Sequence, residues 1–379
     1  MPSRRILYLQ YTNPAGYPPL EHSSRILADQ GWEVLFVGTG ALGAQQFSFP
    51  PHARIQVRQI RFCAAGWRQK LHYLWFCLWA AAWVARWKPA WIYASDLWAC
   101  PPAWLASLLF RRGLIYHEHD SPNARRPGKS AFVGFCLWAR RRCALRAAVC
   151  IVPNAQRAEW FQAETSAHKV VVVWNCPQRM EAALERNGVG AGLRLLYHGS
   201  IVPDRLPVTV IDALSQLPDH VTLTIVGYET VGSLGYLDRL RKRAAELGIS
   251  HRVRHAGILK SRPEVMQVCR QHDIGLSLLP LEADDENSRA MAGASNKPFD
   301  YLANGLALLV SDVPDWRNLF VTSGYARSCN PADPASIAAA VREYDVDRAG
   351  LRMMAEAGRR RVLEEWNYER QFEQVERLL

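Results

Sequence analysis

A chain of 379 residues with 49% hydrophobic and 21% charged residues has ample material for a globular core, which excludes a disordered protein. The length favours two domains over one or three. The charge is uneven: residues 1–180 hold 22 Lys and Arg against 8 Asp and Glu, a net of +14, whereas residues 181–379 hold 24 against 27, a net of −3. Twelve of the 14 Trp also lie before residue 181, so the first half is basic and aromatic.

The cysteines and the N-terminus bear on the cellular compartment. None of the nine cysteines forms a C-x-x-C pair, and most lie inside apolar runs, which is typical of reduced, buried thiols in a cytosolic protein. The start "MPSRRILYLQYTN" passes directly from two arginines into a short strand, so we expect no signal peptide.

Short apolar runs alternate with helical segments along the first half of the chain. The strands predicted there are residues 5–11, 32–38, 90–96, 113–120, 147–154 and 169–175. Helices are expected near residues 21–31 and 98–110. The polar, Gly-bearing stretch "MEAALERNGVGAG" follows, and we expect a domain boundary within residues 177–192.

The pattern then restarts. Strands are predicted at 193–200, 221–229, 252–259, 273–281 and 306–312, with helices at 207–217, 235–248, 262–272 and 296–304. Strands this apolar are buried on both faces of a parallel sheet. The sequence therefore predicts an α/β protein with two Rossmann-like domains.

Ligands of such sheets bind beyond the carboxyl ends of the strands. In the second half, the residues at these ends include glycines, cations and one acid. Glycines let the backbone approach a ligand, and two cations would neutralise a diphosphate at a helix start, where Lys is otherwise disfavoured. These residues predict a nucleotide-diphosphate site: Gly199, Ser200, Arg205, Gly227, Tyr228, Asn296, Lys297 and Asp300. Asp300 fits either two ribose hydroxyls or a partner of the helix dipole.

Residues 296–316, "NKPFDYLANGLALLVSDVPDW", resemble the donor-binding segment of GT-B glycosyltransferases, in particular glycosyltransferase family four. Strands "GWEVLFVG", "PAWIYASD", "IYHEHD" and "VVVVWNCP" are similar to strands of that family, and "LLYHGSIVPDRLP" is similar to its donor loop. "WNYERQFEQVERLL" resembles its C-terminal helix, which crosses back to the first domain.

The resemblance implies the GT-B fold, with two Rossmann-like domains facing across a cleft. An acceptor-binding domain would occupy 1–180, a nucleotide-sugar-binding domain 190–360, and a crossing helix 361–379. It implies transfer of a sugar from a nucleotide diphosphate to an acceptor, with retention of anomeric configuration and usually without metal. No cofactor beyond the donor is expected, and the sequence shows no metal-ligand spacing.

Residue by residue, His119 matches the family's His at the end of a strand, next to the transferred sugar, and is the catalytic candidate. It also fits a structural histidine at a strand end. Asp300 matches the second Glu of the family's Glu, seven residues, Glu motif, and Arg205 falls at the donor-loop Lys. Gly16, Asp96 and His117 are placed on the acceptor side.

Two departures from the family pattern concern the donor sugar. Ala292 stands where the first Glu of the motif is expected, and Ser200 replaces the donor-loop Arg. The following candidates for the missing sugar contact lie in "LEADDENSRAMAGAS": Glu282, Glu286 and Asn287. That loop fits a solvated acidic surface equally well.

The basic, aromatic half suggests a membrane surface. About fifteen mostly apolar residues lie between Lys70 and Arg86, too few for a spanning helix of roughly 20, so a core helix or an interfacial helix is expected. Trp and Arg suit an anionic headgroup layer. The predicted membrane face comprises Trp75, Trp79, Trp83, Arg140, Arg141 and Arg142.

These residues predict a peripheral enzyme at the inner face of the membrane, in glycan, polysaccharide or glycolipid biosynthesis. Its acceptor would be lipid-linked, or a glycan close to the membrane. Nucleic acid is the weaker explanation of the charge, because no recognition motif accompanies it. Two alternatives remain: a non-hydrolysing sugar-nucleotide epimerase, and a non-catalytic GT-B subunit with a degenerate donor site.

Overall fold

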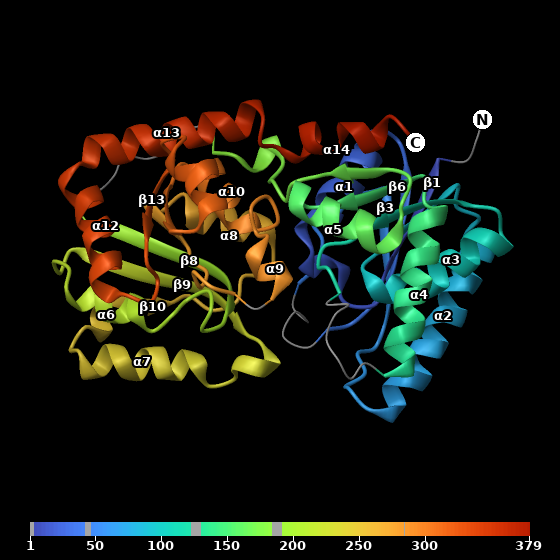
Figure 1. Cartoon of the computed structure of the whole chain (residues 1–379), viewed down its shortest axis with the longest axis horizontal. Helices are drawn as coiled ribbons and strands as arrows, with labels where there is room; N and C mark the ends of the chain where they lie inside the picture. The colour runs from blue at the N-terminus through green and yellow to red at the C-terminus, as the bar shows by residue number, and fades with distance from the viewer. Residues whose placement is uncertain (1–3, 42–46, 123–129, 184–191, 284) are drawn as a thin grey trace. The chain divides into compact units, whose positions relative to one another are not determined.

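The computed structural model describes residues 4–379 except 42–46, 123–129, 184–191 and 284. Half of the predicted interdomain boundary, residues 184–191, therefore lies outside the described residues. The chain forms two compact units (Figure 1). Unit 1 comprises Met1–Asn175, Asp285–Ala294 and Tyr368–Leu379, and unit 2 comprises Cys176–Asp284 and Ser295–Asn367.

Unit 1 is built on a seven-stranded parallel sheet of order β3-β2-β1-β4-β5-β6-β7. Its strands are β1 Arg5–Gln10, β2 Glu33–Thr39, β3 Ile55–Ile60, β4 Trp91–Ser95, β5 Gly113–His117, β6 Val149–Val152 and β7 Val170–Val172. The strand order reverses at β1 and β4, and this is where open α/β sheets bind ligands.

Helices cover both faces of this sheet, so alternate residues of a strand enter different cores. Leu7 and Leu9 face α2, α3, α4 and α5, whereas Ile6 and Tyr8 face α1 and α14. The bounds are α1 Pro18–Asp29, α2 Trp67–Trp87, α3 Cys100–Leu109, α4 Ala131–Arg146, α5 Ala155–Thr165 and α14 Tyr368–Glu376. Burial on both faces explains the continuous apolar runs in the sequence.

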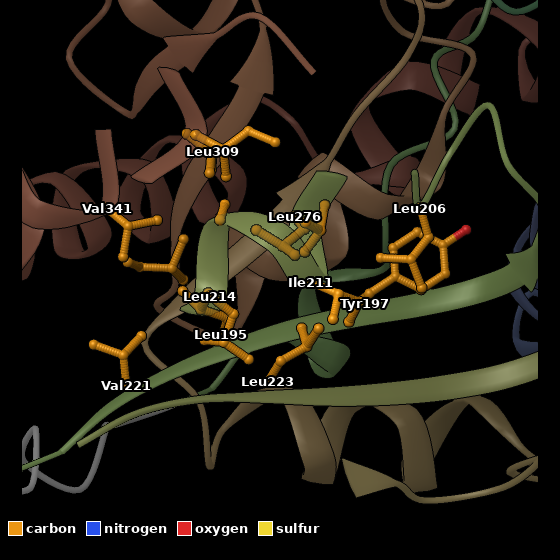
Figure 2. Close-up of a cluster of buried hydrophobic side chains, with 14 of the residues drawn as sticks. Leu195, Tyr197, Leu206, Ile211, Leu214, Val221, Leu223, Leu276, Leu309 and Val341 are labelled. Carbon is orange, nitrogen blue, oxygen red and sulfur yellow. The ribbon is translucent and has the colours of Figure 1, made fainter. Parts of the chain in front are cut away.

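Unit 2 has a six-stranded parallel sheet of order β10-β9-β8-β11-β12-β13. The strands are β8 Leu193–Ile201, β9 Val221–Glu229, β10 Val253–His255, β11 Ile274–Ser277, β12 Ala307–Ser311 and β13 Ala326–Cys329. Figure 2 shows its core, in which Leu195, Leu223 and Leu309 of the sheet lie among side chains of two helices, represented by Leu214 and Val341.

The helices of unit 2 are α6 Thr209–Ser215, α7 Tyr236–Glu246, α8 Arg262–Cys269, α10 Asn296–Ala303, α11 Pro314–Trp316, α12 Pro334–Val346 and α13 Arg348–Glu364. The two-sheet α/β architecture predicted from the sequence is confirmed. Edge strands β3 and β13 were not predicted, because both are rich in polar residues; β3, for example, reads "IQVRQI".

The C-terminal segment returns to unit 1, as predicted. Helix α13 ends at Glu364, and α14 packs against α1 (Figure 1). The ring of Tyr368 lies 5.1 Å from that of His22, and Gln30 donates a hydrogen bond to Glu376 at 3.0 Å. The segment Asp285–Ala294, which contains α9 Glu286–Arg289, also belongs to unit 1, although it lies between β11 and α10 in the chain.

Candidate functional site

The carboxyl edge of the unit 2 sheet is lined by glycines. Gly199 of β8 and Gly227 of β9 are register partners, with φ of 117° and 141°. A Cβ at Gly227 would lie 1.8 Å from the Gly199 carbonyl oxygen, so no other residue fits there. Gly257 has φ of 80°, and its carbonyl accepts a 2.9 Å hydrogen bond from the Gly227 N–H. The next register pair, Ser200 and Tyr228, is half-buried at the same edge.

Lys297 lies over this edge from the first turn of α10. Its Cε would be 2.8 Å from a Cβ placed on Gly199, and its Nζ is 5.6 Å from the centre of the Tyr197 ring. Burial lowers the pKa of Lys297 to about 7, and the positive charge of Arg205 acts in the same direction. Among the described residues, neither Arg205 nor Lys297 has an ion-pair partner. Lys297 of α10 and Arg205 of the loop after β8 are therefore two cations without an ion-pair partner among the described residues, which suits an anion.

Asp300 lies one turn further along α10, and its side chain is buried. Only 1% of it is exposed, and its carboxylate accepts hydrogen bonds from Arg262 at 2.8 and 3.5 Å. Arg262 also pairs with Glu181 at 2.6 Å, and the buried His198 ring lies 3.7 Å from Asp300. The buried carboxylate is therefore stabilised by this guanidinium, and its binding of ribose hydroxyls stays a prediction.

The sugar-contact candidates after β11 are dispersed. Glu282 is exposed in unit 2, whereas Glu286 and Asn287 belong to unit 1. Asn287 exchanges two hydrogen bonds with the Ser121 backbone, at 2.9 and 3.0 Å, so both amide atoms are already occupied. This pairing fixes the Asn287 side chain within unit 1, and its contact with the sugar stays a prediction. Within the described ranges, no group of three or more His, Cys, Asp or Glu is arranged to hold a metal ion.

On unit 1, His119 follows β5 at the carboxyl edge of the sheet. It is 6% exposed, its Nε2 lies 3.0 Å from the Ser95 hydroxyl, and its ring packs against those of His117 and Tyr17 at 3.8 and 5.1 Å. Burial, reinforced by the charge of Arg157, lowers the pKa of His119 to about 3. The imidazole is therefore neutral at physiological pH, and its Nδ1 has no hydrogen-bond partner among the described residues.

The acceptor-side candidates differ in exposure. Gly16 is exposed and precedes Tyr17. Asp96, which has a φ of 62°, accepts the backbone N–H of His119 at 2.8 Å, and burial raises its pKa to about 7. His117 is fully buried, with its Nδ1 2.6 Å from the Tyr93 hydroxyl. The His117 ring packs on that of His119 inside the core, and its placement on the acceptor side stays a prediction.

Arg157 of α5 is a functional candidate that the sequence analysis missed. It is 1% exposed and donates to the carbonyl oxygens of His119, Asn287 and Ala290 at 2.6, 2.9 and 3.1 Å. Asn154 adds 2.8 Å bonds to two carbonyls of the same 285–294 segment. Arg157 thus ties the His119 backbone to the chain that leads directly into α10. In the sequence, only the strand end "VPN" before Arg157 pointed to this position. Nothing local predicted its partners, because they are backbone atoms distant in sequence.

The predicted membrane face is partly exposed. Trp75 is 57% exposed, whereas Trp79 and Trp83 are half-buried and pack on the core of unit 1. Arg141 and Arg142 are exposed. Arg140 is a correction: it is 3% exposed and binds Glu118 at 2.5 and 2.8 Å and Glu164 at 2.7 Å, because a buried arginine requires acidic partners. Among the helices of the described residues, none is long and apolar enough to cross a membrane.

Sequence comparison finds two family models that together span most of the chain. Residues 20–176 match the model described as "Glycosyl transferase 4-like domain", and residues 208–377 match "Glycosyl transferase-like". The chain is a GT-B glycosyltransferase of the family-four type. Both models describe glycosyltransferases, which favours sugar transfer over the epimerase alternative. No curated protein sequence matches this glycosyltransferase.

Solved structures share the fold of this glycosyltransferase at low sequence identity. Anabaena HepE, in complex with UDP and glucose, has a TM-score of 0.70 at 17% identity, covering 99% of this chain and 98% of its own. Sucrose-phosphate synthase from Thermosynechococcus elongatus gives 0.71 at 16%, with coverages of 99% and 98%. WaaG, a glycosyltransferase involved in lipopolysaccharide biosynthesis, gives 0.68 at 14%, with 98% of each chain covered.

Proposed function

We propose that this glycosyltransferase transfers a sugar from a nucleotide diphosphate bound by unit 2 to an acceptor hydroxyl bound by unit 1, with retention at the anomeric carbon. The observation that carries the proposal is the pair of uncompensated cations, Arg205 and Lys297, at the glycine-lined edge where α10 begins. The complexes of HepE with UDP and with UDP-glucose support uridine diphosphate as the carrier.

The arrangement fits the charge changes of the reaction. The bond from the anomeric carbon to the diphosphate breaks, and the acceptor oxygen bonds to that carbon. Negative charge then grows on the diphosphate, where Arg205, Lys297 and the first amides of α10 stabilise it. Because these groups supply the positive charge, we propose that transfer needs no metal ion.

His119 serves as a neutral hydrogen-bonding group in this scheme. With a pKa near 3 it is a poor proton acceptor at physiological pH, so the acceptor's proton passes to the departing diphosphate. Its buried Nδ1 has no hydrogen-bond partner among the described residues and is the ring atom left to bind a substrate hydroxyl. Asp96 and Arg157 fix the main chain of His119 from either side, at its N–H and its carbonyl.

We further propose a lipid-linked or membrane-proximal acceptor and peripheral attachment at the inner face of the membrane. The charge difference between the halves and the exposed Trp75, Arg141 and Arg142 support this. The role of WaaG in lipopolysaccharide biosynthesis is consistent with it.

A panel of nucleotide sugars scored by thermal shift, followed by a transfer assay with membrane extract, tests the proposal. At least one uridine or other nucleoside-diphosphate sugar should raise the melting temperature and pass labelled sugar to the extract. A folded protein that no nucleotide sugar stabilises would contradict the donor assignment and favour a non-catalytic subunit.

A further inference from the structure

Unit 1 contains a cavity that none of the candidate site residues lines. Its volume is about 580 Å³, within the range of small-molecule sites. It lies between the ends of β1 and β2 and the first turns of α2 and α4, and its lining is mainly apolar and aromatic. The residues that matter below are Tyr11, Trp67, Lys70, Trp98 and Val133.

Helix α2, which forms one wall, is apolar on two sides. Its inward stripe of Tyr73, Phe76, Ala80 and Val84 is buried. A second stripe, at the helical spacing i, i+4, i+7, i+8, i+11, is 57–69% exposed: Trp67, Leu71, Leu74, Trp75 and Leu78. Trp67 belongs to both the exposed stripe and the cavity lining, so the cavity opens onto this stripe. A soluble protein rarely exposes such a continuous apolar surface without an occupant.

The positive charge around the cavity favours an anionic ligand. Between Glu33 and Asp96 the sequence has no acidic residue, but it has seven Lys or Arg. One of them, Lys70, lines the cavity and is exposed. An apolar cavity beside a cation that has no ion-pair partner among the described residues suits an amphiphile whose head group is anionic.

The cavity adjoins the residues proposed for catalysis on the same sheet edge. Tyr11 directly follows Gln10, whose side chain lies 3.4 Å from the Asp96 carboxylate. Trp98, two residues after Asp96, stacks on Phe132 with ring centres 5.7 Å apart. The same Asp96 accepts the N–H of His119.

We propose that this cavity is a lipid-binding pocket that takes the apolar chain of a phosphate-bearing lipid acceptor, with the phosphate paired to Lys70. The inference rests on the lipid-linked acceptor proposed above and adds that the enzyme recognises the lipid itself. Trp67 and the exposed stripe of α2 lie against the bilayer from which this lipid enters.

Alkyl phosphates of increasing chain length test the pocket on the intact protein without donor. Each buried CH₂ strengthens binding about fourfold, so decyl phosphate should bind about fifteen times more tightly than octyl phosphate, as followed by tryptophan fluorescence. Val133→Trp, which fills the cavity, should weaken decyl phosphate binding at least tenfold. Lys70→Gln, at an exposed position, should weaken it about fivefold. Leu78→Ser, on the stripe but outside the cavity, should not change it.

Equal affinity for octyl and decyl phosphate would overturn the pocket, as would inorganic phosphate competing as well as decyl phosphate does. Should Val133→Trp fail to fold, unchanged binding by Lys70→Gln overturns it instead. Nucleotide-sugar binding and transfer to membrane extract are measured in parallel. If both persist while alkyl phosphates fail to bind, only the pocket is refuted; if nucleotide sugars also fail to bind, the proposed function falls too.

Discussion

Replacing Lys297 with methionine tests how the donor diphosphate is held. The ammonium lies over Gly199 beside Arg205, without an ion-pair partner among the described residues. Methionine keeps most of the side-chain volume and removes only the charge. The loss of a hydrogen bond to a charged group costs about 1.5–3 kcal/mol, so nucleotide-sugar affinity should fall about 13- to 160-fold.

The affinity should also depend on pH through Lys297. Burial places the pKa of the free lysine near 7, and a bound diphosphate raises it, so binding takes up a proton above pH 7. Wild-type affinity should be highest below pH 7 and fall by up to tenfold per unit as the pH rises through the interval between the two pKa values. The nearby His198 does not interfere, because burial lowers its pKa well below this range.

Calorimetric titration with UDP-glucose at pH 6, 7, 8 and 9 measures both effects. The control Lys242→Met makes the same change at an exposed position on α7, away from the site. This variant should bind UDP-glucose as tightly as the wild type does. Lys297→Met should bind weakly and without pH dependence over this interval. Undiminished affinity in a folded Lys297→Met protein, or a flat wild-type profile, would refute the reasoning.

Four further outcomes follow from the structure. His119→Ala should lower kcat about 100-fold, in a transfer assay, with unchanged UDP-glucose affinity; loss of affinity instead would argue for a structural role. Arg262→Met leaves Asp300 buried without its guanidinium partner and should lower the free energy of unfolding by about 3–5 kcal/mol in urea titrations; a loss below 1 kcal/mol would contradict this. Changing Arg141 and Arg142 together to Ser should weaken cosedimentation with anionic liposomes by about 2 kcal/mol, and binding that ignores lipid charge would refute the membrane proposal. Transfer should persist in EDTA; loss that magnesium or manganese restores would contradict metal-free stabilisation.

The fold was predictable because strand burial leaves a local signature. Runs such as residues 306–310 and 170–174 are apolar throughout, and the restart of the strand and helix pattern in the second half separates two sheets. The glycines at 199 and 227 were also predictable, since both lie near the carboxyl ends of predicted strands. Their direct contact was not, because register between strands is a tertiary property.

The errors concern charged residues whose partners are remote in sequence. Arg140 looked like one of three surface arginines, but Glu118, 22 residues earlier, makes it a buried ion pair. The ion pair of Asp300 with Arg262 was likewise not foreseen, since the two residues are 38 positions apart. Arg157 gave no local signal beyond the strand end that precedes it, because it binds carbonyl oxygens up to 133 residues away. Burial of a charge depends on a partner that only the folded chain reveals.

The central claim is that sugar leaves a nucleotide diphosphate at Lys297 and reaches an acceptor lipid. The most direct measurement incubates the wild type and Lys297→Met with labelled UDP-glucose and other labelled nucleotide sugars in the presence of membrane extract. The label in the lipid fraction is then counted. We expect one donor to label the lipid fraction with the wild type and at least tenfold less with Lys297→Met. Label that stays entirely in the nucleotide for every donor, or equal transfer by both proteins, would contradict the account.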